Sequence, residues 1–584
     1  MKYWIPVNWD ANFDGEGLLF FIQRMQEMLF HFSGDIYRAP VHNTSTLLHE
    51  FLSTYEQSQK GEVGSYQLSP ILEELRNSFS EDKILSDNLG EETMSILSGQ
   101  LNACKEENCF NLIRYIANIV TPQYLEWSVN YLKKHIPKRN HKQEIEKGIR
   151  CWLSEVIMRG YSAEFIYNYA EECLIKKNIT SVDDINVFFD RFDFKDRKYK
   201  VYLQISNSMK DYIETLEQRL SLSFADDGNF PRINQKENYI LCYFEFEELD
   251  HYTAIVHAYH KINIFFKYFR FITNTRKYLL YKFGAVLNCE TDKIYFLPII
   301  PTGFKSFEIQ RDNIQIKTID NIILGVQSHS KNDASKLDKA ITLHNSAIRQ
   351  QLPKDGFINL WSILEVLCPQ GTAKNKLDPI LNAILPILQN DYFATVFETI
   401  ATDLKENLPE SDYQTLVEAI AEPDEIMKVA HFCFLPEYEQ LREDYFEKMP
   451  NLPLLRNKIY SLYELRKNKK ALFALSQRYQ KRVKWHLYRL YRARNSIVHA
   501  GQVPRRIQVL GEHLHSYVDS IMLETAIKLS SQQLLKTIDS VFVDTRLLIR
   551  KKEELFSTNE SISSEDLKLL FRNFFCEHLE DAVE

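Results

Sequence analysis

The chain has 584 residues, of which 45% are hydrophobic and 26% are charged. These proportions are those of a folded globular protein and exclude a disordered one. The length exceeds one hydrophobic core, so we expect roughly two to four domains. The net charge is −8, so the chain is acidic overall, and any local concentration of cations is informative.

Glycine and proline are sparse, at 17 and 18 residues, which favours helices over a many-stranded β architecture. No stretch approaches the ~18 uninterrupted apolar residues of a spanning helix. The first ten residues also lack the apolar core of a signal peptide. We therefore expect a cytoplasmic protein that makes no membrane contact.

The nine cysteines are odd in number and dispersed along the chain, a pattern that predicts reduced thiols. Cys104 and Cys109 are the closest pair. No second pair matches them, as a zinc site would require, so we predict no metal there.

Residues 1–224 are predicted to form a mostly helical N-terminal region. Apolar residues recur at three- and four-residue spacing in 92–104, 110–134 and 141–158, which is typical of helices that pack on a core. The turn-forming stretch 225–231 then breaks this pattern and predicts a domain boundary.

Residues 238–324 differ in character and predict a small α+β module. The aromatic, partly alternating segment 239–246 predicts a strand, and 255–272 shows one apolar helical face. Two further segments, joined across 289–292, predict a hairpin. His257 and His260 lie three apart on the helix and could bind a metal. No Cys or Asp pattern supports them, however, so core or surface histidines are the simpler interpretation.

Residues 334–556 are predicted to form a helical bundle, and 557–584 a C-terminal helical tail, so the fold class is mainly α. In the helix expected at 356–367, Glu365 lies one turn past Trp361 on the apolar side, an unusual place for a carboxylate. A long basic helix is expected from about 472 to 500, where Gly501 predicts its end.

Between Leu465 and Gly511 the chain carries 13 Lys or Arg residues and no Asp or Glu. Such a cationic segment in an acidic chain points toward a phosphate-bearing partner. A solvated helix face is the plain alternative. Trp485, Tyr488 and Tyr491 lie among the cations and could stack on bases, although they fit a helix core equally well.

Arg494, Asn495 and His499 stand out within this segment. Arg offers a permanently charged fork that suits a phosphate, and His moves protons near neutral pH. Asn495 and His499 are four apart and share a helix face. Arg494 and His499 are five apart, about 140° around the axis. They therefore converge only if the Arg side chain bends round, or if a second subunit completes the site.

Residues 485–501 resemble the signature helix of HEPN domains, most closely the Apea-like group with its R-N-x-I-V-H-x-G core. Residues 357–367 resemble the W-x-x-L-E-x-L helix of the same group. The resemblance covers roughly 334–550, and the first 330 residues resemble no family that we can name.

This resemblance implies a helical, commonly dimeric and metal-independent endoribonuclease that needs no cofactor. Arg494 and His499 match the catalytic pair, and Asn495 matches its usual polar neighbour. The ribose 2′-hydroxyl would attack the adjacent phosphate, leaving a 2′,3′-cyclic phosphate and a 5′-hydroxyl. Apea-like proteins are associated with anti-phage defence, so the N-terminal region would sense an unknown phage-derived trigger. The substrate would be tRNA or another structured RNA.

Other residues are assigned supporting roles. Glu365 is expected either to orient Arg494 or Arg492, or to form a plain ion pair between helices. The cations expected to contact RNA are Lys484, Arg489, Arg492, Arg505 and Arg506. Because HEPN domains can be catalytically silent, one alternative is a non-catalytic RNA-binding or dimerisation adapter. Another is a helical interaction protein whose basic helix meets an acidic protein.

Overall fold

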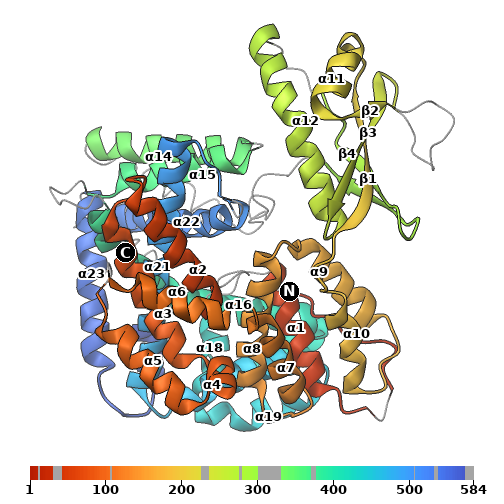
Figure 1. Ribbon diagram of the computed structural model, residues 1–584. Helices are drawn as coiled ribbons and strands as arrows, with labels where there is room; N and C mark the ends of the chain where they lie inside the picture. Colours follow the sequence, from red (N-terminus) through yellow and green to blue (C-terminus); the bar gives the residue numbers. More distant parts are fainter. Residues whose placement is uncertain are drawn as a thin grey trace. The chain divides into compact units, whose positions relative to one another are not determined.

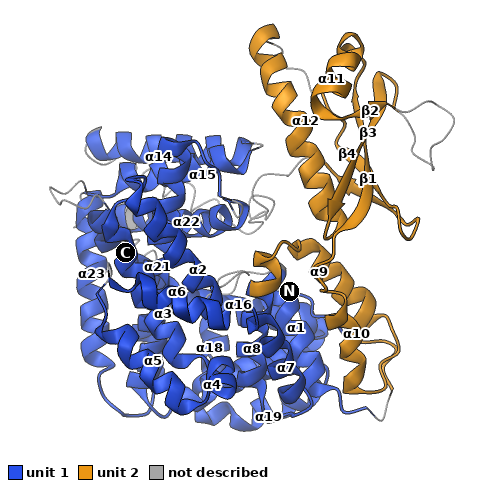
Figure 2. Ribbon diagram, in the orientation of Figure 1, with its two compact units in different colours: residues 1–5, 12–154, 303–584 blue, residues 6–11, 155–302 orange. Residues whose placement is uncertain are grey.

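The computed structural model describes residues 1–10, 13–30, 42–105, 108–224, 236–274, 279–299, 331–350, 352–369, 377–504, 507–531 and 537–571. Helices dominate these residues, as predicted, and a small antiparallel sheet accompanies them (Figure 1). The chain divides into two compact units (Figure 2). Unit 1 holds residues 1–5, 12–154 and 303–584, and unit 2 holds 6–11 and 155–302.

The N-terminal part of unit 1 is helical because its apolar residues recur at helical spacing and close on one another. Its helices are α1 (Glu16–Phe30), α2 (Thr44–Gln59), α3 (Leu68–Glu81), α4 (Lys83–Leu89), α5 (Glu91–Ala103), α6 (Phe110–Val120), α7 (Tyr124–His135) and α8 (Lys142–Met158). Phe51, Leu75 and Ile113 are among the buried residues of the core that α2 to α7 share. The Asp82 side chain caps α4 by accepting hydrogen bonds from the backbone N–H groups of Ile84 and Leu85.

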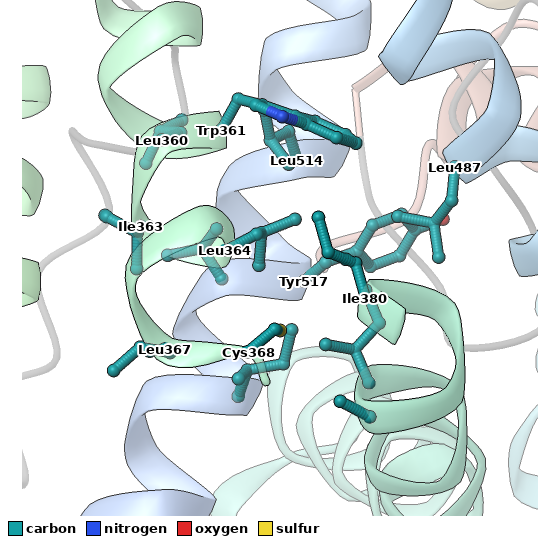
Figure 3. Packing of buried hydrophobic residues seen from close by; sticks show 14 of the residues in the cluster. Leu360, Trp361, Ile363, Leu364, Leu367, Cys368, Ile380, Leu487, Leu514 and Tyr517 are labelled. Carbon is teal, nitrogen blue, oxygen red and sulfur yellow. The ribbon is translucent and has the colours of Figure 1, made fainter. Parts of the chain in front are cut away.

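The C-terminal part of unit 1 is a second helical bundle. Its helices are α14 (Lys331–Arg349), α15 (Pro353–Leu367), α16 (Leu377–Asn407), α17 (Glu410–Glu418), α18 (Glu425–Phe434), α19 (Glu439–Lys448), α20 (Pro453–Leu465), α21 (Lys469–Ala500), α22 (Ile507–Ser531), α23 (Ile538–Leu555) and α24 (Ser564–Phe571). Trp361 of α15, Leu487 of α21 and Tyr517 of α22 meet in its core (Figure 3).

Unit 2 contains the sheet, with strand order β2-β3-β1-β4-β5. Its elements are α9 (Ala163–Ala170), α10 (Ile185–Asp190), β1 (Arg197–Ser206), α11 (Ile213–Leu220), β2 (Ser223–Phe224), β3 (Tyr239–Glu248), α12 (His251–Thr273), β4 (Phe283–Asn288) and β5 (Ile294–Pro298). Residues of α12 and of the strands share one apolar core. The predicted strand, helix and hairpin of this module are confirmed by β3, α12 and the antiparallel pair β4–β5.

The units do not follow the boundary that was predicted near residue 224. Strand β1 lies inside the region predicted to be helical, where it pairs with both β3 and β4. The two compact units instead separate at 154/155, and residues 12–154 belong with the C-terminal helices. Sequence patterning could not show this, because it reports local periodicity and not which distant segments pack into one compact unit.

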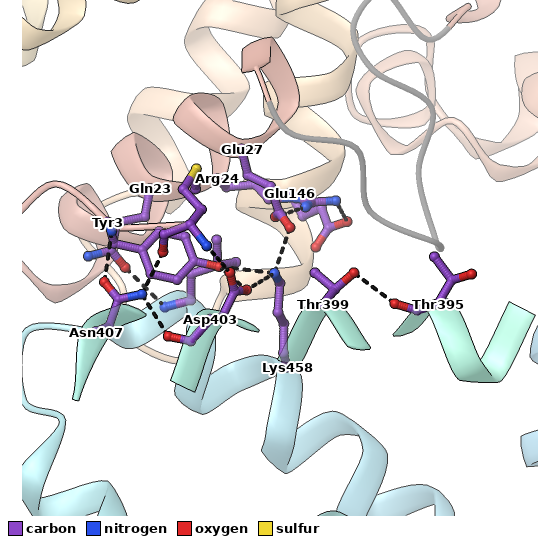
Figure 4. A network of polar contacts seen from close by, with 12 residues as sticks. Tyr3, Gln23, Arg24, Glu27, Glu146, Thr395, Thr399, Asp403, Asn407 and Lys458 are labelled. Carbon is purple, nitrogen blue, oxygen red and sulfur yellow. Dashed lines mark hydrogen bonds and ion pairs between the residues drawn. The ribbon is translucent and has the colours of Figure 1, made fainter. Parts of the chain in front are cut away.

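Buried charges tie the start of the chain to the C-terminal helices of unit 1 (Figure 4). Lys458 Nζ of α20 lies 2.6 Å from Glu27 Oε1, 3.0 Å from Asp403 Oδ2 and 3.0 Å from Tyr3 Oη. The amino group of Met1 lies 3.0 Å from Asp403 Oδ1. Burial lowers the pKa of Lys458, but the nearby Glu27, Tyr3 and Asp403 side chains outweigh it and raise that pKa well above its usual value.

The cysteine prediction needs one correction, because Cys104 and Cys109 form a disulfide. Their Cα atoms lie 5.5 Å apart, which suits such a bond. Cys151, Cys173, Cys242, Cys289, Cys368 and Cys433 are thiols that take no part in a disulfide, as expected. None of the helices in the described ranges has the length and apolar character needed to cross a bilayer.

Candidate functional site

Helix α21 carries the predicted site at its C-terminal end. The Asn468 side chain caps its start by accepting a hydrogen bond from the Ala471 N–H. Gly501 ends it in the left-handed conformation, with φ of 65°. Between these ends, apolar residues such as Leu487 and Leu490 bury one side of α21 in the bundle core. The last two turns therefore hold a fixed position and still reach the surface.

The two resembling helices bring their polar residues together at this end. Arg494 Nη1 lies 3.5 Å from His499 Nε2 and 3.3 Å from Asn495 Oδ1. The same guanidinium reaches across to α15, where its Nη2 lies 3.2 Å from Glu365 Oε1. Thus the Arg494 side chain bends round the helix, and the pair converges within one chain.

Glu365 is in turn held by α15 itself. The Trp361 indole N–H donates to Glu365 Oε1 over 3.0 Å, and the Trp361 ring packs 5.6 Å from Tyr491 between centroids. The contact with Arg494 fits both roles expected for Glu365, an orienting partner and an ion pair between helices. The side chain of Glu365 is 40% exposed and that of Arg494 is 23% exposed, so the pair borders solvent.

This arrangement can act on an anionic ester. The His499 side chain is exposed at the end of α21 and can exchange protons with a bound group. The Arg494 guanidinium beside it keeps its charge and offers N–H groups to phosphate oxygens. The described residues here provide no convergent set of metal ligands.

Two of the cations expected to contact RNA have internal partners instead. Arg489 Nη2 lies 2.8 Å from Glu50 Oε2 and 2.8 Å from Glu74 Oε2, and Arg492 also pairs with Glu50. The two arginine side chains are only 12% and 10% exposed. The expectation that these two arginines face RNA is therefore corrected, because α2 and α3 cover them.

The pKa shifts follow from this burial. Burial raises the pKa of Glu50, but the charges of Arg489 and Arg492 outweigh it and hold that pKa well below its usual range. Burial also raises the pKa of Glu74, which has Arg489 as its main partner and Glu50 as a repelling neighbour. Of the two carboxylates, Glu50 therefore makes the stronger ion pairs with α21.

The remaining cations differ in their surroundings. Lys484 is 40% exposed and lies 3.6 Å from Glu73, so it still borders solvent. Arg505 and Arg506 lie outside the described residues. Among the aromatic side chains, Trp485 and Tyr488 are only 6% and 8% exposed, which makes them core residues and not base-stacking platforms.

Sequence reasoning missed the acidic residues that meet α21, because they lie more than 400 positions away. No local pattern in the sequence pairs Glu50 or Glu74 with α21. Sequence reasoning also missed a cavity of 480 Å³ that α21 shares with the N-terminal helices. Arg478, Glu74 and Lys147 are among its lining residues, so both signs of charge face it.

The alternative metal candidates in unit 2 have a simpler role. His257 Nδ1 lies 2.7 Å from Glu248 Oε1, and burial lowers the pKa of His260. Within the described residues these two histidines do not join a group of three metal-capable side chains. Comparison with protein-family models, with curated proteins and with solved structures gives no match for this chain.

Proposed function

We propose that the protein is a metal-independent endoribonuclease of the HEPN type, with its reaction centre at the end of α21. One observation carries the proposal: Arg494 lies 3.5 Å from His499 and 3.2 Å from Glu365. These residues come from the two helices that resemble the Apea-like group. Each motif is short and common by itself. Here they bring an acid, Glu365, and two basic side chains, Arg494 and His499, into contact.

The proposed reaction is a transesterification within RNA. The ribose 2′-oxygen bonds to phosphorus while the bond to the 5′-oxygen breaks, giving a 2′,3′-cyclic phosphate and a 5′-hydroxyl. His499 moves the protons that leave the 2′-hydroxyl and reach the 5′-oxygen. Arg494 stabilises the charge that builds on the phosphorane, and Asn495 hydrogen-bonds within the site. Glu365 is a positioning residue, since it acts through Arg494.

The partners follow from the same proposal. The substrate is RNA, with tRNA and other structured RNAs as candidates, and the setting is cytoplasmic anti-phage defence. We propose a homodimer, because the HEPN domains that this chain resembles are commonly dimeric. The N-terminal helices would regulate α21 in response to a phage-derived trigger, and their ion pairs with Arg489 and Arg492 support such a role.

The test compares purified wild-type protein with His499→Ala and Arg494→Ala on a labelled RNA. We expect wild-type cleavage that leaves 5′-hydroxyl and 2′,3′-cyclic phosphate ends, with a loss of at least about 100-fold in both variants. His257→Ala, an exposed histidine of unit 2, is the matched control and should cleave normally.

A substrate with a single 2′-deoxyribose at the cleaved position gives the sharper check. It should resist cleavage, since the attacking hydroxyl is missing. Cleavage that persists there, or that leaves 5′-phosphate ends, would contradict the mechanism. So would full activity of both His499→Ala and Arg494→Ala.

A non-catalytic adapter is the second candidate, and the Glu365 contact favours it. A guanidinium that already pairs with a carboxylate has less charge to offer a phosphate. In that case the wild-type protein would bind RNA in a salt-sensitive way and leave it intact. The same cleavage assay, run with a binding assay at two salt concentrations, separates the two candidates.

A further inference from the structure

Three potential metal ligands converge where α14 faces α22. His344 Nε2 lies 3.2 Å from His515 Nε2 and 2.9 Å from Asp519 Oδ1. His515 Nε2 lies 3.3 Å from the same Asp519 oxygen. His515 and Asp519 are four residues apart on α22, so they share one face, and His344 approaches from α14. The three atoms therefore form a closed triangle.

Hydrogen bonds leave one side of this triangle without an attractive contact. If both imidazole nitrogens carry protons, both donate to Asp519 Oδ1, and the two nitrogens lie 3.2 Å apart with no bond between them. If only one carries a proton, the other nitrogen turns a lone pair toward the ionised carboxylate oxygen. Every assignment of protons thus leaves at least one pair of atoms in the triangle without an attractive contact. A cation at the centre resolves all three contacts, because each atom then directs a lone pair at it.

We propose that His344, His515 and Asp519 bind one divalent transition-metal ion, with Zn²⁺ as the best fit. Zinc bonds to nitrogen and oxygen are about 2.0–2.1 Å long, so ligand atoms in a tetrahedral site stand roughly 3.4 Å apart. The observed 2.9–3.3 Å approaches that spacing. Two imidazoles and one carboxylate suit zinc or iron, whereas Mg²⁺ and Ca²⁺ prefer oxygen ligands.

The surroundings allow an ion to enter and to be held. The His515 side chain is 7% exposed, and those of His344 and Asp519 are each 20% exposed. The described residues supply three ligands, so water or another group would complete the tetrahedron. The ion would cross-link two helices whose ligands lie 171 residues apart. It would thereby stabilise the bundle that includes α21, and the inference does not depend on RNA cleavage.

The test measures metal directly on the full-length protein. Protein stripped by a chelator is titrated with Zn²⁺ in competition with a chromophoric chelator, and then with Mg²⁺ in the same way. We expect one Zn²⁺ per chain and no competing Mg²⁺. Asp519→Asn and His344→Gln should each weaken Zn²⁺ binding by at least about 100-fold. His257→Ala, outside the triangle, should bind as the wild type does.

Two further readouts guard against a folding artefact. Added Zn²⁺ should raise the Tm of wild type and His257→Ala by a few degrees and leave Asp519→Asn unchanged. Co²⁺ should give the visible absorption of a tetrahedral site in the wild type and not in Asp519→Asn. Wild type that binds no Zn²⁺, or ligand variants that bind it equally well, would overturn the proposal.

Discussion

At the scale of single residues, Glu365 connects the two helices that carry the proposed centre. Its Oε1 accepts the Trp361 N–H and also faces Arg494 Nη2. Because Trp361 is fully buried, its hydrogen bond holds the Glu365 carboxylate in place. The carboxylate in turn orients the Arg494 guanidinium. The sequence made Glu365 noticeable as a carboxylate on an apolar face. It could not show which arginine the carboxylate meets.

We expect Glu365→Gln to lower kcat about 10-fold or more with little change in KM, since it removes the charge that orients Arg494. The Tm should stay nearly constant, because a partly exposed ion pair contributes at most about 1 kcal/mol. Steady-state kinetics and a thermal melt check both. A kcat equal to that of the wild type would show that Glu365 is only a surface partner.

At the scale of elements, the sequence predicted the features that depend on neighbouring residues. It did not predict those that depend on contacts between distant segments. The ends of α21 and the β4–β5 hairpin depend on neighbouring residues, such as Gly501, so the sequence predicted them. Strand β1 depends on β3 and β4, which come later in the chain, and was missed. For the same reason Arg489 was assigned to RNA, when its partners lie on α2 and α3.

The contact between α2 and α21 gives a stability prediction. Glu50→Ala would leave Arg489 and Arg492 buried with one fewer carboxylate, which we expect to cost about 3 kcal/mol of unfolding free energy. Glu73→Ala is the matched control, because its pairs with Lys481 and Lys484 are exposed. Denaturant unfolding measures both. Equal effects would mean that the buried pairs hold α21 no more firmly than surface charges do.

At the scale of the whole molecule, ion pairs join the N-terminal and C-terminal helices of unit 1, and others join the N-terminal helices to one another. Glu146 of α8 pairs with Arg24 of α1 across 3.1 Å (Figure 4). It also pairs with Arg150. Burial raises the pKa of Glu146, but the two arginines outweigh it and lower that pKa to about 2. A carboxyl group with so low a pKa couples the stability of the unit to pH.

The lowered pKa of Glu146 determines how the unfolding free energy changes with pH. Since the pKa of Glu146 is lower in the folded state than in the unfolded chain, its contribution is complete above about pH 4.5 and is lost as pH falls toward 2. The full contribution is on the order of 3 kcal/mol. Glu146→Gln should flatten the fall in unfolding free energy between pH 5 and 3, measured by denaturant titration. Glu62→Gln, at an exposed position, should leave the slope unchanged.

The order of segments in unit 1 has a consequence for synthesis. Residues 12–154 leave the ribosome long before α21 does, because unit 2 is translated between them. Glu50 and Glu74 are therefore already present when Arg489 and Arg492 emerge. We therefore expect the cationic helix α21 to meet its acidic partners as it emerges, in surroundings crowded with ribosomal RNA. The order of translation would thus keep Arg489 and Arg492 paired with their own carboxylates and away from ribosomal RNA.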